Sequence, residues 1–158
     1  MTRRILSLAA LLAPVLLHAG DSVRDRATMK GCKAVAVIID TLPADFGKDG
    51  VTEETLRSRL AQRLREADIP MDAAAKEFVG LRVSSVRDGR GPYAAAFTLG
   101  FYQPVTLVRD AAIRSAPETW SFETVFMAPP KILPRAATDA IDDVAARFIT
   151  AWRAVNPQ

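Results

Sequence analysis

Histidine and cysteine are nearly absent from this chain. Each occurs once, and the histidine, His18, lies in an amino-terminal segment that we expect to be removed. The mature protein is then left without imidazole, which excludes Ser-His-Asp and Cys-His catalysis and histidine-rich zinc sites. The single cysteine, Cys32, provides neither an internal disulfide nor a thiolate metal site. We expect Cys32 to be buried as a small apolar residue, with reaction with a partner thiol as the alternative.

Motifs that bind phosphate or calcium are also missing. Gly89 and Gly91 follow a strand pattern but lead into another strand, whereas a phosphate loop opens a helix. A calcium loop beginning at Asp45 fails, because Leu56 stands where a bidentate glutamate is required. We therefore predict no catalytic, cofactor-binding or metal-binding residues and no cofactor.

Carboxylate chemistry remains open, because acid-base pairs of carboxylates need no imidazole. The alternative function is then a carboxylate-dependent hydrolase of an envelope polymer, although no spacing singles out one pair of acids. The arginines of the first predicted helix, with Arg82, Arg87 and Arg90, form an anion-attracting surface if the helix and the hairpin end lie close, but a solvated helix face is the favoured interpretation. The candidate acids are Asp40, Asp45, Asp49 and Glu123.

The amino terminus carries the pattern of an export signal. Arg3 and Arg4 precede an apolar stretch, 5–17, and the small residue Ala19 completes a cleavage site. The stretch contains a proline and is shorter than the roughly 20 residues of a membrane-spanning helix. No cysteine follows it, so lipid attachment lacks an acceptor. We predict that 1–19 is a signal peptide and that the product is periplasmic or secreted.

Processing also changes the charge balance. The whole chain has 21 basic and 18 acidic residues, and two of the basic residues leave with the signal peptide. A mature domain so close to neutrality lacks the basic surface of a nucleic-acid-binding protein. We therefore expect no nucleic acid partner.

Hydrophobic periodicity predicts an α+β fold after a flexible lead, 20–31. The order β-α-β-β-β-α indicates a single two-layer domain, 32–158, with a roughly four-stranded, mostly antiparallel sheet and two helices on one face. The first β-α-β connection allows one parallel pair. Segments 41–50 and 109–118 are expected to be loops. The expected strands are 34–39, 79–84, 93–108 with a bulge, bend or edge at Gln103 and Pro104, and 119–127, and the expected helices are 52–67 and 134–155.

One aromatic residue differs from those expected in the core. Tyr102 lies on the opposite parity from Phe97 and Phe101 and, with Pro104, predicts an accessible strand edge that accepts a partner chain. The other aromatic residues favour core packing, and a ligand cavity between sheet and helices is the alternative.

Several short segments resemble small secreted bacterial proteins of unassigned function, over most of the mature chain. The order of elements also resembles periplasmic two-layer α/β modules that join envelope complexes. These resemblances imply a non-catalytic role in the cell envelope and no site residues. We predict an exported, non-enzymatic binding or assembly module of the bacterial cell envelope, with a carboxylate-dependent hydrolase or a small-ligand carrier as alternatives. The segments are Ile39-Asp40 at a strand end, the helix 52–67, the strand 101–109, Thr119-Trp120 and the terminal Val155-Asn156-Pro157.

Overall fold

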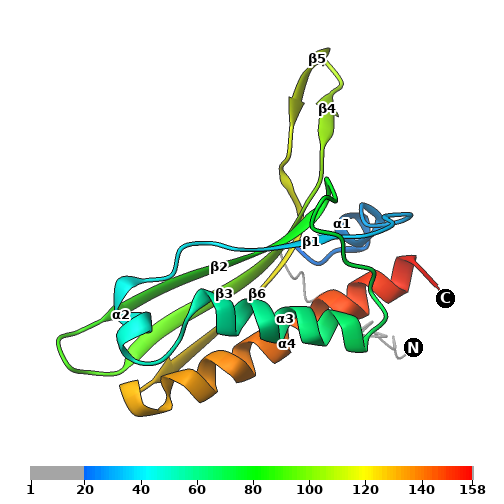
Figure 1. Ribbon diagram of the computed structural model, residues 1–158. Helices are drawn as coiled ribbons and strands as arrows, with labels where there is room; N and C mark the ends of the chain where they lie inside the picture. Colours follow the sequence, from blue (N-terminus) through cyan, green and yellow to red (C-terminus); the bar gives the residue numbers. More distant parts are fainter. Residues whose placement is uncertain (1–19, 158) are drawn as a thin grey trace, which may run out of the picture.

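The computed structural model describes residues 20–157, and the predicted signal peptide, 1–19, lies outside the described residues. Four strands form the main sheet, two more form a separate hairpin, and helices pack on one side (Figure 1). The elements are α1 (Val23–Ala27), β1 (Ala36–Ile39), α2 (Ala44–Lys48), α3 (Glu53–Glu66), β2 (Phe78–Arg87), β3 (Tyr93–Tyr102), β4 (Val105–Leu107), β5 (Asp110–Ser115), β6 (Glu118–Ala128), the 3-10 helix η1 (Pro130–Ile132) and α4 (Leu133–Val155).

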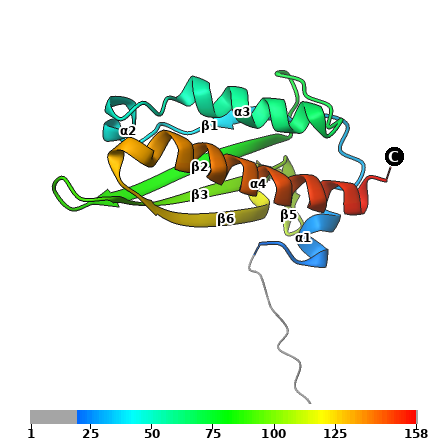
Figure 2. The ribbon, with the colours of Figure 1, turned by 90° about the horizontal axis from the view of Figure 1, so that it is seen from below.

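The main sheet has the strand order β1-β2-β3-β6. β1 runs parallel to β2, while β2, β3 and β6 are antiparallel neighbours. Figure 2 shows α3 and α4 side by side across one face of this sheet. The predicted α+β fold, with its mostly antiparallel sheet and two helices on one face, is confirmed. Within residues 20–157, no helix combines the length and apolar composition needed to cross a bilayer.

The two long helices follow from their apolar stripes. Thr52 begins α3, because its side chain accepts a hydrogen bond of 3.2 Å from the Thr55 amide. Leu56, Leu60 and Leu64 then recur at helical spacing and are buried against the sheet. Pro134 lies in the first turn of α4, where a backbone N–H would have no acceptor within the helix, so the N–H that proline lacks is not missed. The buried stripe of α4 includes Ile141, Val144 and Phe148. Both helices are therefore held by the core.

Two segments predicted to be flexible or irregular contain short helices. The lead 20–31 carries α1, whose N-cap Ser22 and Asp25 form a reciprocal capping box, and Met29 is fully buried. This segment therefore contains a capped helix and contacts the core through Met29, while its flexibility stays a prediction. The expected loop 41–50 contains α2, with Phe46 fully buried. Helices of five residues are too short to show apolar periodicity, so the sequence does not reveal them.

A third segment also differs from its prediction. Residues 109–118 are expected to form a loop, but β4 and β5 pair as an antiparallel hairpin, with Val105 opposite Ser115 and Thr106 opposite Arg114. The predicted break at Gln103 and Pro104 is present, since β3 ends at Tyr102 and β4 begins at Val105. The chain leaves the main sheet there and returns in β6.

The predicted edge at Tyr102 is wrong. β3 is paired with β2 on one side and with β6 on the other, so it is an interior strand. The Tyr102 ring stacks on Phe78 at a centroid distance of 4.8 Å, and its hydroxyl donates to Glu118 at 2.9 Å. Tyr102 is half-buried on the sheet face away from the helices. The true edges of the sheet are the outer sides of β1 and β6.

Candidate functional site

A hairpin projects from the body of the molecule. This projecting hairpin, residues 105–115, extends away from the sheet and helices (Figure 1). Every residue of β5 is exposed, Val108 at the tip is fully exposed, and Ile113 is 43% exposed. Its charged residues are Arg109, Asp110 and Arg114, a small basic excess. An exposed apolar tip on an isolated two-stranded sheet is typical of an element that another surface covers.

Within residues 20–157, the outer edge of β6 is open along most of its length. The Ser121 amide donates outward to the Gly20 carbonyl at 3.0 Å. Alternate residues of a strand direct their backbone groups to the same side, so the N–H and C=O groups of Glu123, Val125 and Met127 also face outward. The free stretch is 122–128, between the residue bonded to Gly20 and Pro129, which has no N–H. An unpaired edge of this kind is a template for another strand.

An apolar patch adjoins that open edge on the sheet face away from the helices. Val86 is 73% exposed, Val125 is 66% exposed and Met127 is 72% exposed. The pairing places Val86, Ala94 and Met127 in one row across the sheet, with Ala96 and Val125 in the next row. The small alanines leave a shallow hollow of about 190 Å³ between the larger side chains. Edge and patch together form one continuous docking surface.

The opposite edge of the sheet, on β1, is protected. A parallel bridge from Met71 covers Val35, whose amide donates to Pro70 and whose carbonyl accepts from Asp72, both at 3.1 Å. Next along the strand, Arg57 donates to the Val37 carbonyl at 2.7 Å. These contacts occupy three of the outward-facing backbone groups of this edge, to which a new strand would bond. Between the two sheet edges, β6 is therefore the more accessible one.

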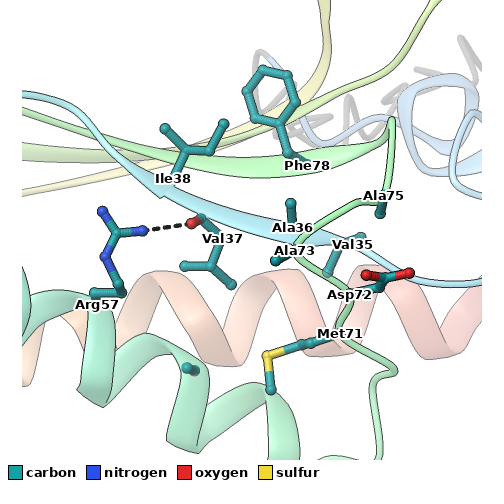
Figure 3. A pocket seen from close by; sticks show the side chains of 11 residues that line it. Val35, Ala36, Val37, Ile38, Arg57, Met71, Asp72, Ala73, Ala75 and Phe78 are labelled. Carbon is teal, nitrogen blue, oxygen red and sulfur yellow. Dashed lines mark hydrogen bonds between the residues drawn. The ribbon is translucent and has the colours of Figure 1, made fainter.

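A groove of about 440 Å³ lies beside β1, between α3 and the segment that precedes β2 (Figure 3). Its walls are mostly apolar, from residues such as Val35, Met71 and Phe78, and its charged groups are Arg57 and Asp72. The sequence places a ligand cavity between the sheet and the helices, whereas this groove lies at the sheet edge. It has the size of a small-ligand site.

A cluster of hydrogen bonds around the Asp21 carboxylate anchors the amino-terminal segment to β6. Both nitrogens Nε and Nη2 of Arg26 donate to Asp21 at 2.6 Å, and the Trp120 indole donates to the same carboxylate at 2.7 Å. Burial of Asp21 disfavours its charge, but the hydrogen bonds from Arg26 and Trp120 outweigh it and lower the pKa of that carboxyl. The sequence does not reveal this cluster, because Asp21 and Trp120 are far apart in the chain.

A second cluster involves the predicted candidate Asp49. The Tyr93 hydroxyl donates to Asp49 at 2.6 Å, and Arg87 donates to Asp49 at 3.2 Å and to the Tyr93 oxygen at 2.8 Å. The bond to the Asp49 carboxylate, together with burial, raises the pKa of Tyr93. The cluster ties the end of α2 to the turn between β2 and β3. Asp49 is thus engaged in a structural contact.

Among the four candidate acids, Asp45 and Asp49 lie one turn apart at α2, whereas Asp40 and Glu123 are widely separated. Asp40 follows β1 and Glu123 lies on β6, three strand spacings apart or roughly 14 Å. Glycosidase acids are about 5 to 9.5 Å apart. Asp45 pairs with Lys48 at 2.9 Å on the surface, and Glu123 accepts a hydrogen bond from Thr98 at 2.8 Å. Asp40 and Glu123 therefore lack the spacing of a glycosidase pair.

The possible metal ligands and the single cysteine, Cys32, are the remaining candidates for a site. Among residues 20–157, no group of three or more His, Cys, Asp or Glu side chains is placed to hold a metal ion. Cys32 is half-buried beside the core, and its thiol contacts the Ala34 carbonyl at 3.4 Å. Burial, with a smaller effect of Glu77, raises the pKa of this thiol. Cys32 is thus disfavoured as a nucleophile.

No protein-family model matches the chain, and no curated protein sequence matches it. Solved bacterial structures resemble it in part. A dodecamer of a PelC variant from Paraburkholderia phytofirmans is 20% identical, with 73% of this chain and 86% of that chain covered and a TM-score of 0.44. A minor lipoprotein from Acinetobacter baumannii is 10% identical, with 77% and 91% covered and a TM-score of 0.40. At these values, neither likeness assigns an activity, partner or location to this chain.

Proposed function

We propose that this chain is an exported, non-enzymatic binding or assembly module of the bacterial cell envelope, and that the projecting hairpin is its contact element. The observation that carries this proposal is the exposure of the whole of β5 and of Val108 at the tip. A two-stranded hairpin without a packed face is at best marginally stable in water. Contact with another surface would bury its apolar side chains and offset the entropy lost in ordering it.

Export is supported by the signal pattern in 1–19. The first described residues also fit cleavage after Ala19, because Gly20 and Asp21 bond to β6 and belong to the folded body. A cut further along the chain would remove these contacts. The product would then be periplasmic or secreted.

A non-enzymatic role is supported by the placement of the acids. Asp49 is held by Arg87 and Tyr93, and Asp40 and Glu123 lie too far apart for hydrolysis. Once the signal peptide is removed, no imidazole remains for nucleophilic catalysis.

The proposal predicts that the hairpin tip contacts another protein in the envelope. A photoreactive amino acid at Val108 should give a discrete cross-linked product in living cells. The matched control is Val23 on α1, which is 85% exposed but lies on the body of the molecule. We expect little or no product from position 23. Uniformly low cross-linking at Val108, Arg109 and Ile113 would contradict the proposal.

The groove beside β1 favours a small-ligand carrier as the second candidate function. Its walls suit a small apolar molecule, and Arg57 suits an anionic end group. Native mass spectrometry of the exported chain should then detect a bound small molecule, and Ala61→Trp should abolish that binding by filling the groove. An exported chain that shows only its own mass, and that is not stabilised by fatty acids of graded length, would remove this candidate.

A further inference from the structure

We infer that the partner of the projecting hairpin is a second copy of this chain, and that the hairpin adds as a strand to the open edge of that copy's β6. This inference rests on the proposed function and names the partner. It joins the two surfaces described above, the hairpin 105–115 and the β6 edge 122–128, in a head-to-tail contact.

The lengths of the two elements match. The free stretch of β6 is bounded by Ser121, whose amide is bonded to Gly20, and by Pro129, which lacks a donor. β5 has six residues, all exposed, and its side away from β4 has no strand neighbour in the described part of the chain. Addition of β5 to this stretch would extend the four-stranded sheet of one copy by the hairpin of another.

The apolar surfaces also match. The hairpin presents Val108 and Ile113 to solvent, while the receiving edge is flanked by Val125 and Met127. Beside them lies the shallow hollow formed over the alanines of β3. Pairing would therefore cover apolar area on both partners at once.

The charges around the two surfaces are complementary. Glu123 borders the β6 edge on the open sheet face, and Asp139 and Asp143 border it on the helix side, around a hollow of about 260 Å³. Both aspartates are exposed, and Asp143 has no ion-pair partner among residues 20–157. Asp139 faces Arg135 at 3.9 Å, and the nearby Arg147 lies over the Phe122 ring. The hairpin supplies Arg109 and Arg114 against one acid, Asp110, so the contact pairs a hairpin of small basic excess with an acidic rim.

The contact forms between molecules because the hairpin cannot reach its own β6 edge. The hairpin leaves the sheet where β6 begins, at Glu118, and points away from the body (Figure 1). Val125 lies seven residues further along β6, or roughly 23 Å at 3.3 Å per residue. Each copy therefore offers a hairpin to one neighbour and an edge to another. Such a heterologous contact closes into a ring or continues as a chain.

Two variants, each lacking one of the two contact surfaces and called half-blocked, test the head-to-tail contact directly. Both are made in the chain purified after export. The first replaces 105–115 with a short Gly-Ser turn and keeps the β6 edge. The second, Val125→Pro, keeps the hairpin and blocks the edge, and its missing N–H faces outward, so the bonds to β3 are retained. Val125→Lys with Met127→Lys is an alternative edge block that leaves the backbone unchanged. Circular dichroism confirms that each variant is folded.

Sedimentation velocity should show assembly of the unaltered chain that grows with concentration, and monomers for each half-blocked variant alone. An equimolar mixture of the two variants should form a 1:1 dimer, since one still offers an edge and the other a hairpin. Self-association of the hairpin-free variant would overturn the inference in favour of edge-to-edge pairing. Self-association of both edge-blocked variants would overturn it in favour of hairpin-to-hairpin pairing.

A charge exchange tests the polarity of the contact. Arg109→Glu with Arg114→Glu should weaken assembly about tenfold, and adding Asp139→Arg with Asp143→Arg to the same chain should restore it. Failure of that restoration would contradict the pairing of charges. A chain that stays monomeric at all concentrations, while Val108 cross-links to a different envelope protein, would overturn this inference and leave the proposed function standing. A monomeric chain without any cross-linked product would overturn both.

Discussion

Replacing Phe148 with alanine is expected to lower the free energy of unfolding by about 3–5 kcal/mol, the typical loss for a fully buried phenylalanine. Phe148 is fully buried on α4, and its ring centroid lies 5.4 Å from that of Trp120 and 5.8 Å from that of Trp152. The Phe101 ring of β3 is 6.3 Å away. The substitution would leave a cavity where α4 meets β3 and β6. Urea unfolding followed by tryptophan fluorescence would measure the loss.

Two variants serve as controls for that measurement. Phe148→Leu keeps most of the side-chain volume and should cost about 1 kcal/mol. Thr150→Ala changes an exposed residue on the same helix and should stay within about 0.5 kcal/mol. A loss below about 1 kcal/mol for Phe148→Ala would contradict the packing of α4 on the sheet.

Replacing Asp21 with asparagine is expected to cost about 1.5–3 kcal/mol at pH 7, because three hydrogen bonds to a charged, mostly buried carboxylate are lost or weakened. The contribution of Asp21 also depends on pH. Its pKa in the folded protein lies below the ordinary value of 3.8. Its stabilising effect is therefore complete above pH 3.8 and is lost as the pH falls through that value towards the folded pKa.

The measurement is the free energy of unfolding of both proteins between pH 7 and pH 2.5. The difference between them should be constant at neutral pH and should shrink below about pH 3.8. Asp45→Asn is the matched control, because Asp45 forms an exposed surface pair with Lys48 and its replacement should have little effect. A difference that stays constant down to pH 2.5 would show that the Asp21 charge does not anchor the amino-terminal segment.

The main sheet and the long helices could be predicted because their apolar residues face a core. Leu56, Leu60 and Leu64 mark α3 by a repeat that only a helix aligns, and Phe97, Leu99 and Phe101 mark β3 by alternation. The projecting hairpin could not be predicted in this way. β5 has no covered face, so its sequence carries no alternation between apolar and polar residues.

The candidate site was only partly predictable for a related reason. The parity of Tyr102 distinguishes the two faces of the sheet, but whether a strand is interior or at an edge depends on the strand order. That order is set by the return of β6 beside β3, a pairing across the hairpin. Likewise, Asp49 has the local pattern of a turn residue, while Arg87 and Tyr93, its partners, are 38 and 44 residues away. Local patterns do not encode such long-range neighbours.

The hairpin is inserted between two adjacent strands, since β3 ends at Tyr102 and β6 begins at Glu118. β3 and β6 pair with each other whatever the length of the chain that joins them, and doubling a connecting loop costs only about 0.6 kcal/mol of closure entropy. The length of the projecting hairpin therefore has little effect on the stability of the main sheet and the helices that cover it. Hairpins of different length could be grafted at this junction to change how far the contact element extends, without redesign of the core.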